Sequence, residues 1–366
     1  MRSISIILID RMKKVIVLGG GISGVFAAIR IKEKHPDYFV SVFEHNDKLL
    51  KKIYATGNGK CNFANKGSLN NKYNHEEFAL NIINQFNCND IVNYFEKIGI
   101  KSKSIGDLLY PYSESAETVA IHLLDRIKQL NIDVHLQCEV KDYQNGHLLT
   151  DRGEFTYDAL IISLGGKSSP NLGSNGSFYD SLIKHGYAIR ECHPSLCPIK
   201  TKENTKMVEG LRHKVNVQLY QGNKLIHEEE GELLFKKDGL SGMVIFNMTH
   251  YINRLDNRNN ITLHVDFAKG IDGDYESLVN PKLAKYLISN KLDIHNVIFT
   301  FKDFYEYSNS QVTSGGISIT ELNDDLSSKR EKNIYFIGEV IDIDAVCGGY
   351  NIMWALASAE LVSKKI

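Results

Sequence analysis

The alternation of apolar and polar positions predicts a strand, a helix and a second strand near the start of the chain. The apolar run 15–18 stops at three glycines, and apolar residues then recur with helical spacing over 22–34. Pro36 is expected to end that helix, because proline cannot continue the helical hydrogen-bond ladder. A second apolar run, residues 39–43, ends at Glu44. Strand, helix and strand in this order form a βαβ unit, whose two strands run parallel.

The pattern that follows predicts three helices and then several strands. The expected helices lie near 76–86, 88–98 and 115–130. The expected strands are 132–140, a hairpin punctuated by Gly146 and Gly153, and 159–163. The last of these runs is almost wholly apolar, which is typical of a parallel strand buried on both faces.

Near Pro194 and Pro198 the pattern of apolar and polar residues changes, and from there it predicts mostly β-strands. Strands are expected at 214–220, 224–229, 233–235, 261–265 and 296–301, with helices from Ser241 and over 281–289. A strand at 334–337 and a terminal helix at 350–363 then restore the earlier pattern. The order predicts an α/β fold: a Rossmann-like domain with a parallel central sheet, residues 12–195 and 310–366, interrupted by a mostly β domain, residues 196–309.

The glycine-rich turn between the first strand and the first helix carries the strongest local signal for a dinucleotide. Gly19, Gly21 and Gly24 have the G-x-G-x-x-G spacing. The first glycine permits a tight turn, the second lets the backbone approach a diphosphate, and the third lets helix and strand pack closely. The helix start at Ile22 and Ser23 adds N–H donors and the positive end of the helix dipole.

An acidic residue completes this fingerprint at the end of the second strand. Glu44 lies 20 residues after the third glycine and can accept hydrogen bonds from ribose hydroxyls. His45 beside it is a further candidate for cofactor binding. A carboxylate at this position disfavours a 2′-phosphate, so FAD or NAD is preferred over NADP. The fingerprint alone leaves FAD and NAD open.

Charge and cysteine usage narrow the class of protein. The 366 residues include 43 Lys and Arg and 44 Asp and Glu, with a formal net charge of −1. Nucleic-acid binders usually carry a basic excess, so no nucleic-acid partner is expected.

The six cysteines lack any Cys-x-x-Cys spacing, which predicts no metal site and the reduced thiols of a cytoplasmic protein. The apolar run Ile4–Ile9 is too short for a signal peptide or a membrane span, so no membrane partner is expected. Met12 directly precedes Lys13 and the first strand, so the residues before it are expected to be an extension ahead of the natural start.

Three further segments carry longer motifs. They are KKIYATGNGKCN at 51–62, LGGKSSPNLGSNG at 164–176, and TSGGI at 313–317 followed by GEVIDID at 338–344 and GGYN at 348–351. In this order they resemble motifs of the YhiN/BaiN-like flavoproteins, a family that includes aminoacetone oxidase-like FAD enzymes. Thr56, Asn58 and Lys60 stand where the family has Ser, Gly and Arg, and the helical segment before Gln311 is shorter than in the family.

The resemblance implies FAD as the cofactor, a Rossmann-like FAD-binding domain interrupted by a mostly β substrate domain, and roles for the matching residues. Glu44 would bind the adenosine ribose, and the backbone at Val140 would meet adenine. The loop 52–62 and Gly338–Glu339 would meet the diphosphate and ribityl chain, while residues 349–351 would face the flavin pyrimidine. The resulting FAD candidates, besides the fingerprint residues, are Lys52, Thr56, Gly57, Gly59, Cys61, Asn62, Val140, Gly165, Gly166, Gly338, Glu339, Gly349, Tyr350 and Asn351.

The sequence therefore favours an FAD-dependent oxidoreductase that moves a hydride between the flavin and a small organic substrate, as a reductase or an amine-type oxidase. Only one complete fingerprint is present, so NAD(P)H is expected at most as a transient electron donor. Cys61, Cys347 and His193 each have a simpler structural interpretation, and no catalytic residue is assigned. An RNA-associated flavoprotein of the tRNA-modifying type and an NAD-dependent dehydrogenase are the alternatives, and the oligomeric state is left open.

Overall fold

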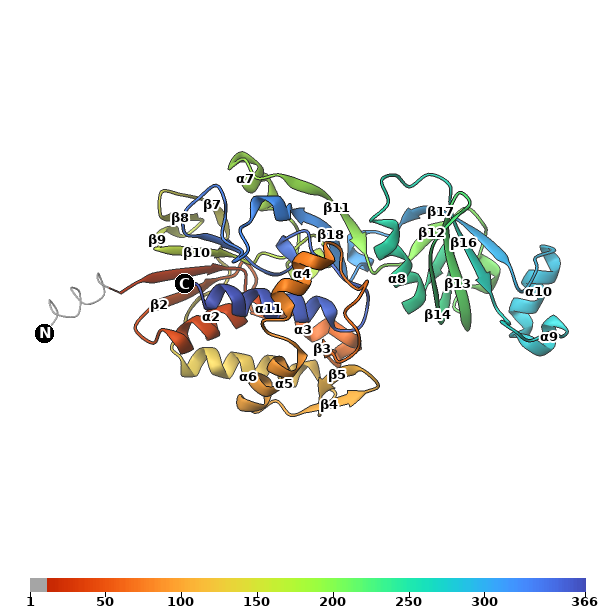
Figure 1. The fold of residues 1–366 in the computed structure, drawn as a ribbon, viewed down its shortest axis with the longest axis horizontal. Helices are drawn as coiled ribbons and strands as arrows, with labels where there is room; N and C mark the ends of the chain where they lie inside the picture. Colours follow the sequence, from red (N-terminus) through yellow and green to blue (C-terminus); the bar gives the residue numbers. More distant parts are fainter. Residues whose placement is uncertain (1–11) are drawn as a thin grey trace, which may run out of the picture. The chain divides into compact units, whose positions relative to one another are not determined.

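The structure, a computed structural model, describes residues 12–366, so the run Ile4–Ile9 lies outside the described residues. The chain forms two compact units (Figure 1). The first unit runs up to Cys192 and resumes over Gly315–Ile366, and the second is His193–Ser314. The predicted insertion, residues 196–309, lies inside the second unit.

A five-stranded sheet forms the centre of the first unit, in the order β19-β10-β1-β2-β6. Its strands are β1 (Lys14–Leu18), β2 (Phe39–Phe43), β6 (Asp133–His135), β10 (Ala159–Ile162) and β19 (Ile334–Phe336). All four neighbouring pairs are parallel. β10 lies between β1 and β19, and all four of its residues are buried. The predicted Rossmann-like domain with a parallel sheet is confirmed, as is the mostly β region described below.

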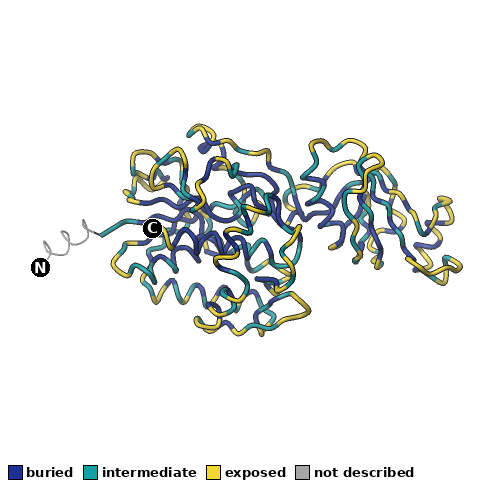
Figure 2. The backbone as a smooth tube through the Cα atoms, in the orientation of Figure 1, coloured by how far each residue is buried: buried dark blue, intermediate teal, exposed yellow. Residues whose placement is uncertain are grey.

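The helix α2 (Ile22–Lys34) packs against β1 and β2 of this sheet, and α11 (Tyr350–Ser363) packs alongside α2 (Figure 1). Arg30 Nε and Lys34 Nζ reach the two carboxylate oxygens of Glu360 on α11, at 2.6 and 2.9 Å. Burial alone would raise the pKa of Glu360, but its hydrogen bonds and charge contacts with the two cations outweigh burial and lower it. α11 is buried over most of its length (Figure 2), which is typical of a helix enclosed within a domain.

The remaining elements of the first unit surround this core. Between β2 and β6 lie α3 (Lys51–Ala55), β3 (Ala64–Asn65), α4 (Glu76–Ile83), α5 (Cys88–Lys97), β4 (Ser102–Ile105), β5 (Leu108–Pro111) and α6 (Ala116–Gln129). After β6 come β7 (Val140–Gln144), β8 (His147–Thr150), β9 (Gly153–Thr156) and α7 (Tyr179–Lys184). Outside the barrel described below, β11 (Ile189–Ser195) and β18 (Val312–Ile317) form a two-stranded sheet.

The single strand predicted at 132–140 is wrong, because the chain breaks there. β6 ends at His135 and β7 begins at Val140 in a separate antiparallel sheet. Between them Gln137 has a φ of +52°, and the backbone N–H groups of Gln137 and Cys138 donate to carbonyls of Asn46 and Glu44. These bonds to the loop after β2 replace the ladder that one continuous strand would need.

The second unit is a closed barrel in the order β12-β15-β14-β13-β16-β17. Its elements are β12 (Ile199–Thr201), β13 (Arg212–Gln221), β14 (Lys224–Lys236), β15 (Gly239–Ser241), α8 (Met243–Ile252), β16 (Ile261–Asp266), α9 (Tyr275–Leu278), α10 (Pro281–Ser289) and β17 (Val297–Phe304). The two strands predicted at 224–229 and 233–235 are one strand, β14, because β13 pairs with it past the acidic run Glu228–Glu230. Between residues 12 and 366, no helix combines the length and apolarity that crossing a membrane requires.

Candidate cofactor site

The glycine turn lies where β1, α2 and β10 come together. Gly19 has a φ of +98°, and a Cβ on it would lie 2.5 Å from the carbonyl oxygen of Ser163. A Cβ on Gly24 would overlap the carbonyl oxygen of Gly19 and the hydroxyl of Ser163. Ser163 Oγ in turn donates to the Leu18 carbonyl at 2.6 Å. The first and third glycines of the fingerprint are therefore required by close packing of helix and strand.

Gly21 differs from both, because a Cβ on it would meet no described atom within 4 Å. It is the N-cap of α2, and in the described part of the chain no side chain caps this helix and no acid stands in its first turn. The first N–H groups of α2, including those of Ile22 and Ser23, thus lie at the positive end of a 13-residue helix beside open space. Such an arrangement fits a diphosphate, which needs main-chain donors and close backbone approach.

Glu44 is fixed beside this turn at the end of β2. Its Oε2 accepts from Gly20 N at 2.7 Å, and its Oε1 accepts from Asn46 N and Nδ2 at 2.8 and 2.7 Å. His45 Nδ1 lies 3.4 Å from Oε1. A carboxylate oxygen accepts more than one hydrogen bond, so Glu44 keeps acceptor capacity for a ribose hydroxyl.

The chain entering β7 and the loop after β10 both reach the neighbourhood of Glu44. Cys138 N donates to the Glu44 carbonyl at 3.0 Å, and Val140 follows two residues later. In the loop after β10, a Cβ on Gly173 would lie 3.4 Å from His45 Cε1 and would overlap the Asn46 amide. Gly165 and Gly166 begin this loop directly after the Ser163-Leu164 segment that touches Gly19.

The segment 51–62 contributes a run of left-handed backbone. Gly57, Asn58, Gly59 and Cys61 all have positive φ. Successive residues of this kind turn backbone N–H groups toward one side and form concavities that suit anions. The hydroxyl of Thr56 makes a hydrogen bond within the same segment, because it donates to the Ile53 carbonyl at 2.7 Å.

Cys61 is enclosed by the protein and is not a reactive thiol. It is fully buried, and burial raises the pKa of its thiol to about 11. All six cysteines lie in the described part of the chain, and none of them forms a disulfide there. A thiolate is the reactive form, so this burial argues against a redox role for the Cys61 thiol.

The segment from Gly338 to Gly349 links the glycine turn to the start of α11. A Cβ on Gly338 would lie 2.6 Å from Ser23 Oγ, so this residue touches the first turn of α2. Glu339 Oε2 accepts from Lys52 Nζ at 2.8 Å, which joins two predicted site residues from distant parts of the chain. Gly349 has a φ of +89°, and a Cβ on it would lie 2.7 Å from the Ala64 carbonyl oxygen.

Three predicted site residues near the start of α11 are held by protein partners. With the Asn62 amide oriented to satisfy its neighbours, its oxygen accepts from Gly349 N at 3.2 Å. Tyr350 donates its hydroxyl to the Ser68 carbonyl at 3.2 Å, and the Asn351 amide bonds both N and O of Ala345 at 2.9 Å. The side chains of Tyr350 and Asn351 are therefore engaged by the protein. What the start of α11 could offer to a ligand is its backbone, because its N-cap, Gly349, has no side chain to cap the helix.

A cluster that the sequence interpretation missed lies on the same segment. Asp342 Oδ2 is 3.0 Å from His75 Nε2 and 3.7 Å from Arg190 Nη1. Asp342 belongs to the GEVIDID motif, which was the available signal, but nothing in the local sequence connects it with His75 or Arg190.

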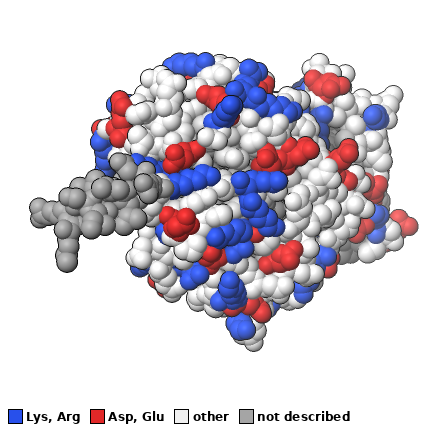
Figure 3. All heavy atoms as spheres, turned by 60° about the vertical axis from the view of Figure 1, so that its left-hand side comes forward, with Lys and Arg blue, Asp and Glu red and all other residues white. Residues whose placement is uncertain are grey.

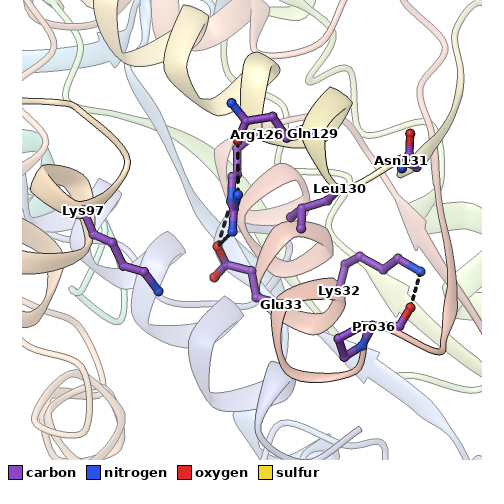
Figure 4. A pocket seen from close by; sticks show the side chains of 8 residues that line it. All are labelled: Lys32, Glu33, Pro36, Lys97, Arg126, Gln129, Leu130 and Asn131. Atoms are coloured by element: carbon purple, nitrogen blue, oxygen red, sulfur yellow. Dashed lines mark hydrogen bonds and ion pairs between the residues drawn. The ribbon is translucent and has the colours of Figure 1, made fainter.

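A hollow of about 450 Å³ lies elsewhere in the first unit, away from the glycine turn (Figure 4). Its lining includes Lys32 and Glu33 of α2 and Arg126 of α6. Arg126 bonds Glu33 at 2.7 and 2.8 Å, and Lys32 Nζ donates to the Pro36 carbonyl at 2.8 Å. This is the C-terminal end of α2, roughly 20 Å along the helix from Gly21 at 1.5 Å per residue.

Relatives of known activity match almost the whole chain. It is 27% identical to the 3-dehydro-bile acid delta(4,6)-reductase of Clostridium scindens, over 96% of this chain and 98% of the relative. It is 25% identical to the ribosomal RNA dihydrouridine synthase of Haemophilus influenzae, over 94% of this chain and 96% of the relative. A 3-ketosteroid delta1-dehydrogenase from Sterolibacterium denitrificans shares the fold, with a TM-score of 0.52, 10% identity, and coverage of 97% of this chain and 99% of that one.

The fold and these comparisons define the class as FAD-dependent oxidoreductases with a Rossmann-type domain. The chain belongs to the family described as HI0933-like protein Rossmann domain, which matches residues 13–365. The predicted family, enzyme class and use of FAD are thereby confirmed.

Proposed function

We propose that the protein reduces a carbon–carbon double bond conjugated to a carbonyl group in a small organic substrate. The observation that carries the cofactor part of this proposal is the open start of α2 at Gly21 beside the fixed carboxylate of Glu44, and the names of two relatives carry the reaction. The segment Gly338–Gly349 continues from that turn to a second uncapped helix start, that of α11. Bound FAD supplies a hydride, and the protein supplies position, charge and a proton.

The names of two relatives support the direction of the reaction. One is a delta(4,6)-reductase of a 3-dehydro-bile acid, and the other forms dihydrouridine from uridine in RNA. Chemically, both names describe saturation of a double bond in a ring that carries a carbonyl group. Neither name describes amine oxidation, so we favour a reductase over the amine-type oxidase.

In this proposal the predicted site residues divide into groups along the cofactor. The N–H groups at Gly21–Gly24 bind the diphosphate, Glu44 and His45 meet the ribose, and the backbone at Val140 meets adenine. The concave backbone of 56–62, with Lys52, faces the ribityl and phosphate region, and the start of α11 faces the flavin pyrimidine. Helix-start N–H groups there stabilise the negative charge that reduced flavin carries. NAD(P)H docks transiently as the electron donor.

Reduction of uridine in RNA is the second candidate, and the Haemophilus influenzae relative is the observation that favours it. Charge argues for the small substrate instead. Residues 193–314 contain 15 Lys and Arg and 15 Asp and Glu. On the face drawn in Figure 3, the two signs are interspersed. An RNA substrate benefits from a basic surface, because phosphate contacts dominate affinity. Retention of ribosomal RNA that weakens steeply with salt would favour the second candidate.

Anaerobic photometry of the bound flavin tests the proposal. NADH, NADPH and a panel of amines are offered to the oxidised protein, and conjugated enones are then offered to the reduced protein. We expect a reduced nicotinamide to bleach the flavin and an enone to restore its colour. Bleaching by an amine, together with no reoxidation by any enone, would overturn the assignment as a reductase.

A further inference from the structure

We infer that His75 delivers the proton that completes double-bond reduction, held in place by the buried carboxylate of Asp342. This assignment rests on the proposed function. His75 Nε2 lies 3.0 Å from Asp342 Oδ2. The side chain of Asp342 is 3% exposed, whereas that of His75 is 30% exposed. The contact therefore links the buried carboxylate of Asp342 to the solvent-accessible imidazole of His75.

Asp342 is held in position by groups on both sides of the segment. Asn74 Nδ2 donates to Asp342 Oδ1 at 3.1 Å and to its carbonyl at 3.2 Å. Asp342 N donates to the Ile317 carbonyl at 2.9 Å. Arg190 Nη1 lies 3.7 Å from Oδ2 with a side chain that is 49% exposed. The carboxylate therefore has a defined orientation and meets two cationic or ionisable groups.

The ring of His75 is left with one nitrogen for a substrate. Asp342 occupies Nε2, and no described group hydrogen-bonds to Nδ1. A protonated imidazole carries hydrogen on both nitrogens, so Nδ1 can give its proton while Nε2 stays bonded to the carboxylate. A base or acid oriented by a third group is the usual arrangement for proton transfer in active sites.

The backbone of His75 has an unusual conformation that follows a segment held by Asn74. Its φ and ψ are 43° and 48°, a left-handed conformation that is uncommon for any residue other than glycine. The preceding residue explains how the conformation is held: Asn74 N donates to the Asp344 carbonyl at 3.1 Å, and Asn74 Oδ1 accepts from Asp344 N at 2.8 Å. His75 therefore follows directly after a residue, Asn74, that is hydrogen-bonded to the GEVIDID motif at 338–344.

The location matches the proposed chemistry. Residues 72–75 run along 342–346, with Val346 N donating to the Lys72 carbonyl at 3.1 Å. That strip lies in the segment between Gly338, which touches the first turn of α2, and Gly349, the N-cap of α11. The pair therefore lies along the proposed path of the cofactor from diphosphate to flavin.

The step balances in atoms and electrons. An external nicotinamide-type donor would supply one hydride, that is two electrons and a proton, and become oxidised nicotinamide, and bound FAD would pass that hydride to the substrate. A hydride then forms a C–H bond at the β-carbon of the enone, the carbon–carbon π bond breaks, and its electrons pass to the α-carbon and carbonyl oxygen. His75 Nδ1–H donates its proton to the α-carbon, and the neutral ring regains a proton from water.

The test compares holoenzymes carrying His75→Gln, Asp342→Asn or the control His185→Gln. His185 is a matched control because both of its nitrogens are occupied, by Asp142 at 2.9 Å and Glu331 at 3.1 Å. Flavin is reduced with dithionite without oxygen and mixed with 2-methylcyclohex-2-enone. The rate of reoxidation and the configuration at the α-carbon of early product are measured. FAD affinity and thermal unfolding report the integrity of each variant.

We expect His75→Gln to slow reoxidation by the enone about 100-fold or more, the usual scale of general acid catalysis. The early product should lose its single configuration, because water then protonates either face, while FAD affinity and reoxidation by dioxygen stay unchanged. Asp342→Asn should give an intermediate rate with partial loss of configuration, and it decides the question if His75→Gln does not fold. Wild-type rate and configuration in the His75 variant, or in Asp342→Asn if only that variant folds, would overturn the assignment. A wild-type protein that no enone reoxidises would overturn the proposed function and this assignment with it.

Discussion

Replacing Gly21 with alanine separates cofactor binding from folding. Gly21 has φ and ψ of −71° and −178°, an extended conformation that alanine adopts without strain. Its added Cβ meets no described atom within 4 Å. The stability of the apoprotein should therefore change by less than about 1 kcal/mol, the scale of an alanine at a helix N-cap.

The same methyl group would occupy the space through which a diphosphate reaches the first N–H groups of α2. Loss of one hydrogen bond to a charged group costs about 1.5–3 kcal/mol. This corresponds to roughly a 10- to 100-fold weaker Kd for FAD. Flavin fluorescence quenching measures this Kd, and urea unfolding followed by circular dichroism measures the stability of the apoprotein.

Gly24→Ala provides the contrast. Its Cβ would overlap the Gly19 carbonyl and the Ser163 hydroxyl, so the apoprotein itself should lose about 1–3 kcal/mol of stability. The reasoning is refuted if Gly21→Ala binds FAD as tightly as the wild-type protein. It is equally refuted if the two variants lose the same stability without cofactor.

Three further predictions follow from the geometry. Glu44→Gln should weaken FAD binding and also destabilise the apoprotein by about 1–3 kcal/mol, because an amide NH₂ would face the donors of Gly20 or Asn46; urea unfolding checks this. The pKa of Glu360 is lowered in the folded protein, so its ionised form stabilises the fold. This contribution is fully present above the pKa that Glu360 has in the unfolded chain, and it is lost as the pH falls through the lower pKa of the folded protein. Glu360→Gln should therefore cost about 3 kcal/mol at pH 7, with the difference from wild type shrinking in acid, and unfolding curves between pH 7 and pH 3 measure it. Cys61 should resist iodoacetamide in the folded protein at pH 8 and react once urea is added, which peptide mapping would show, since burial raises the pKa of its thiol to about 11.

The βαβ unit was predictable because the determinants are local. The helix observed over 22–34 and the strand over 39–43 have the bounds expected from apolar spacing, glycine and proline. The family motifs added FAD, which the glycine spacing alone left open.

Other features depend on contacts between distant residues. The break between β6 and β7 is set by hydrogen bonds from Gln137 and Cys138 to residues about 90 positions earlier, and β14 is continuous because β13 pairs along it. His75 and Asp342 are 267 positions apart, so no local pattern joins them. The spacing of apolar residues along the chain reflects local conformational preference, whereas pairings between distant residues are determined by the tertiary fold.

An experimental structure of the protein with FAD bound tests the central claim most directly. We predict diphosphate oxygens within hydrogen-bonding distance of the N–H groups at the start of α2 and a ribose hydroxyl on Glu44. A nucleotide bound elsewhere, or side chains filling the space beside Gly21, would contradict the assignment.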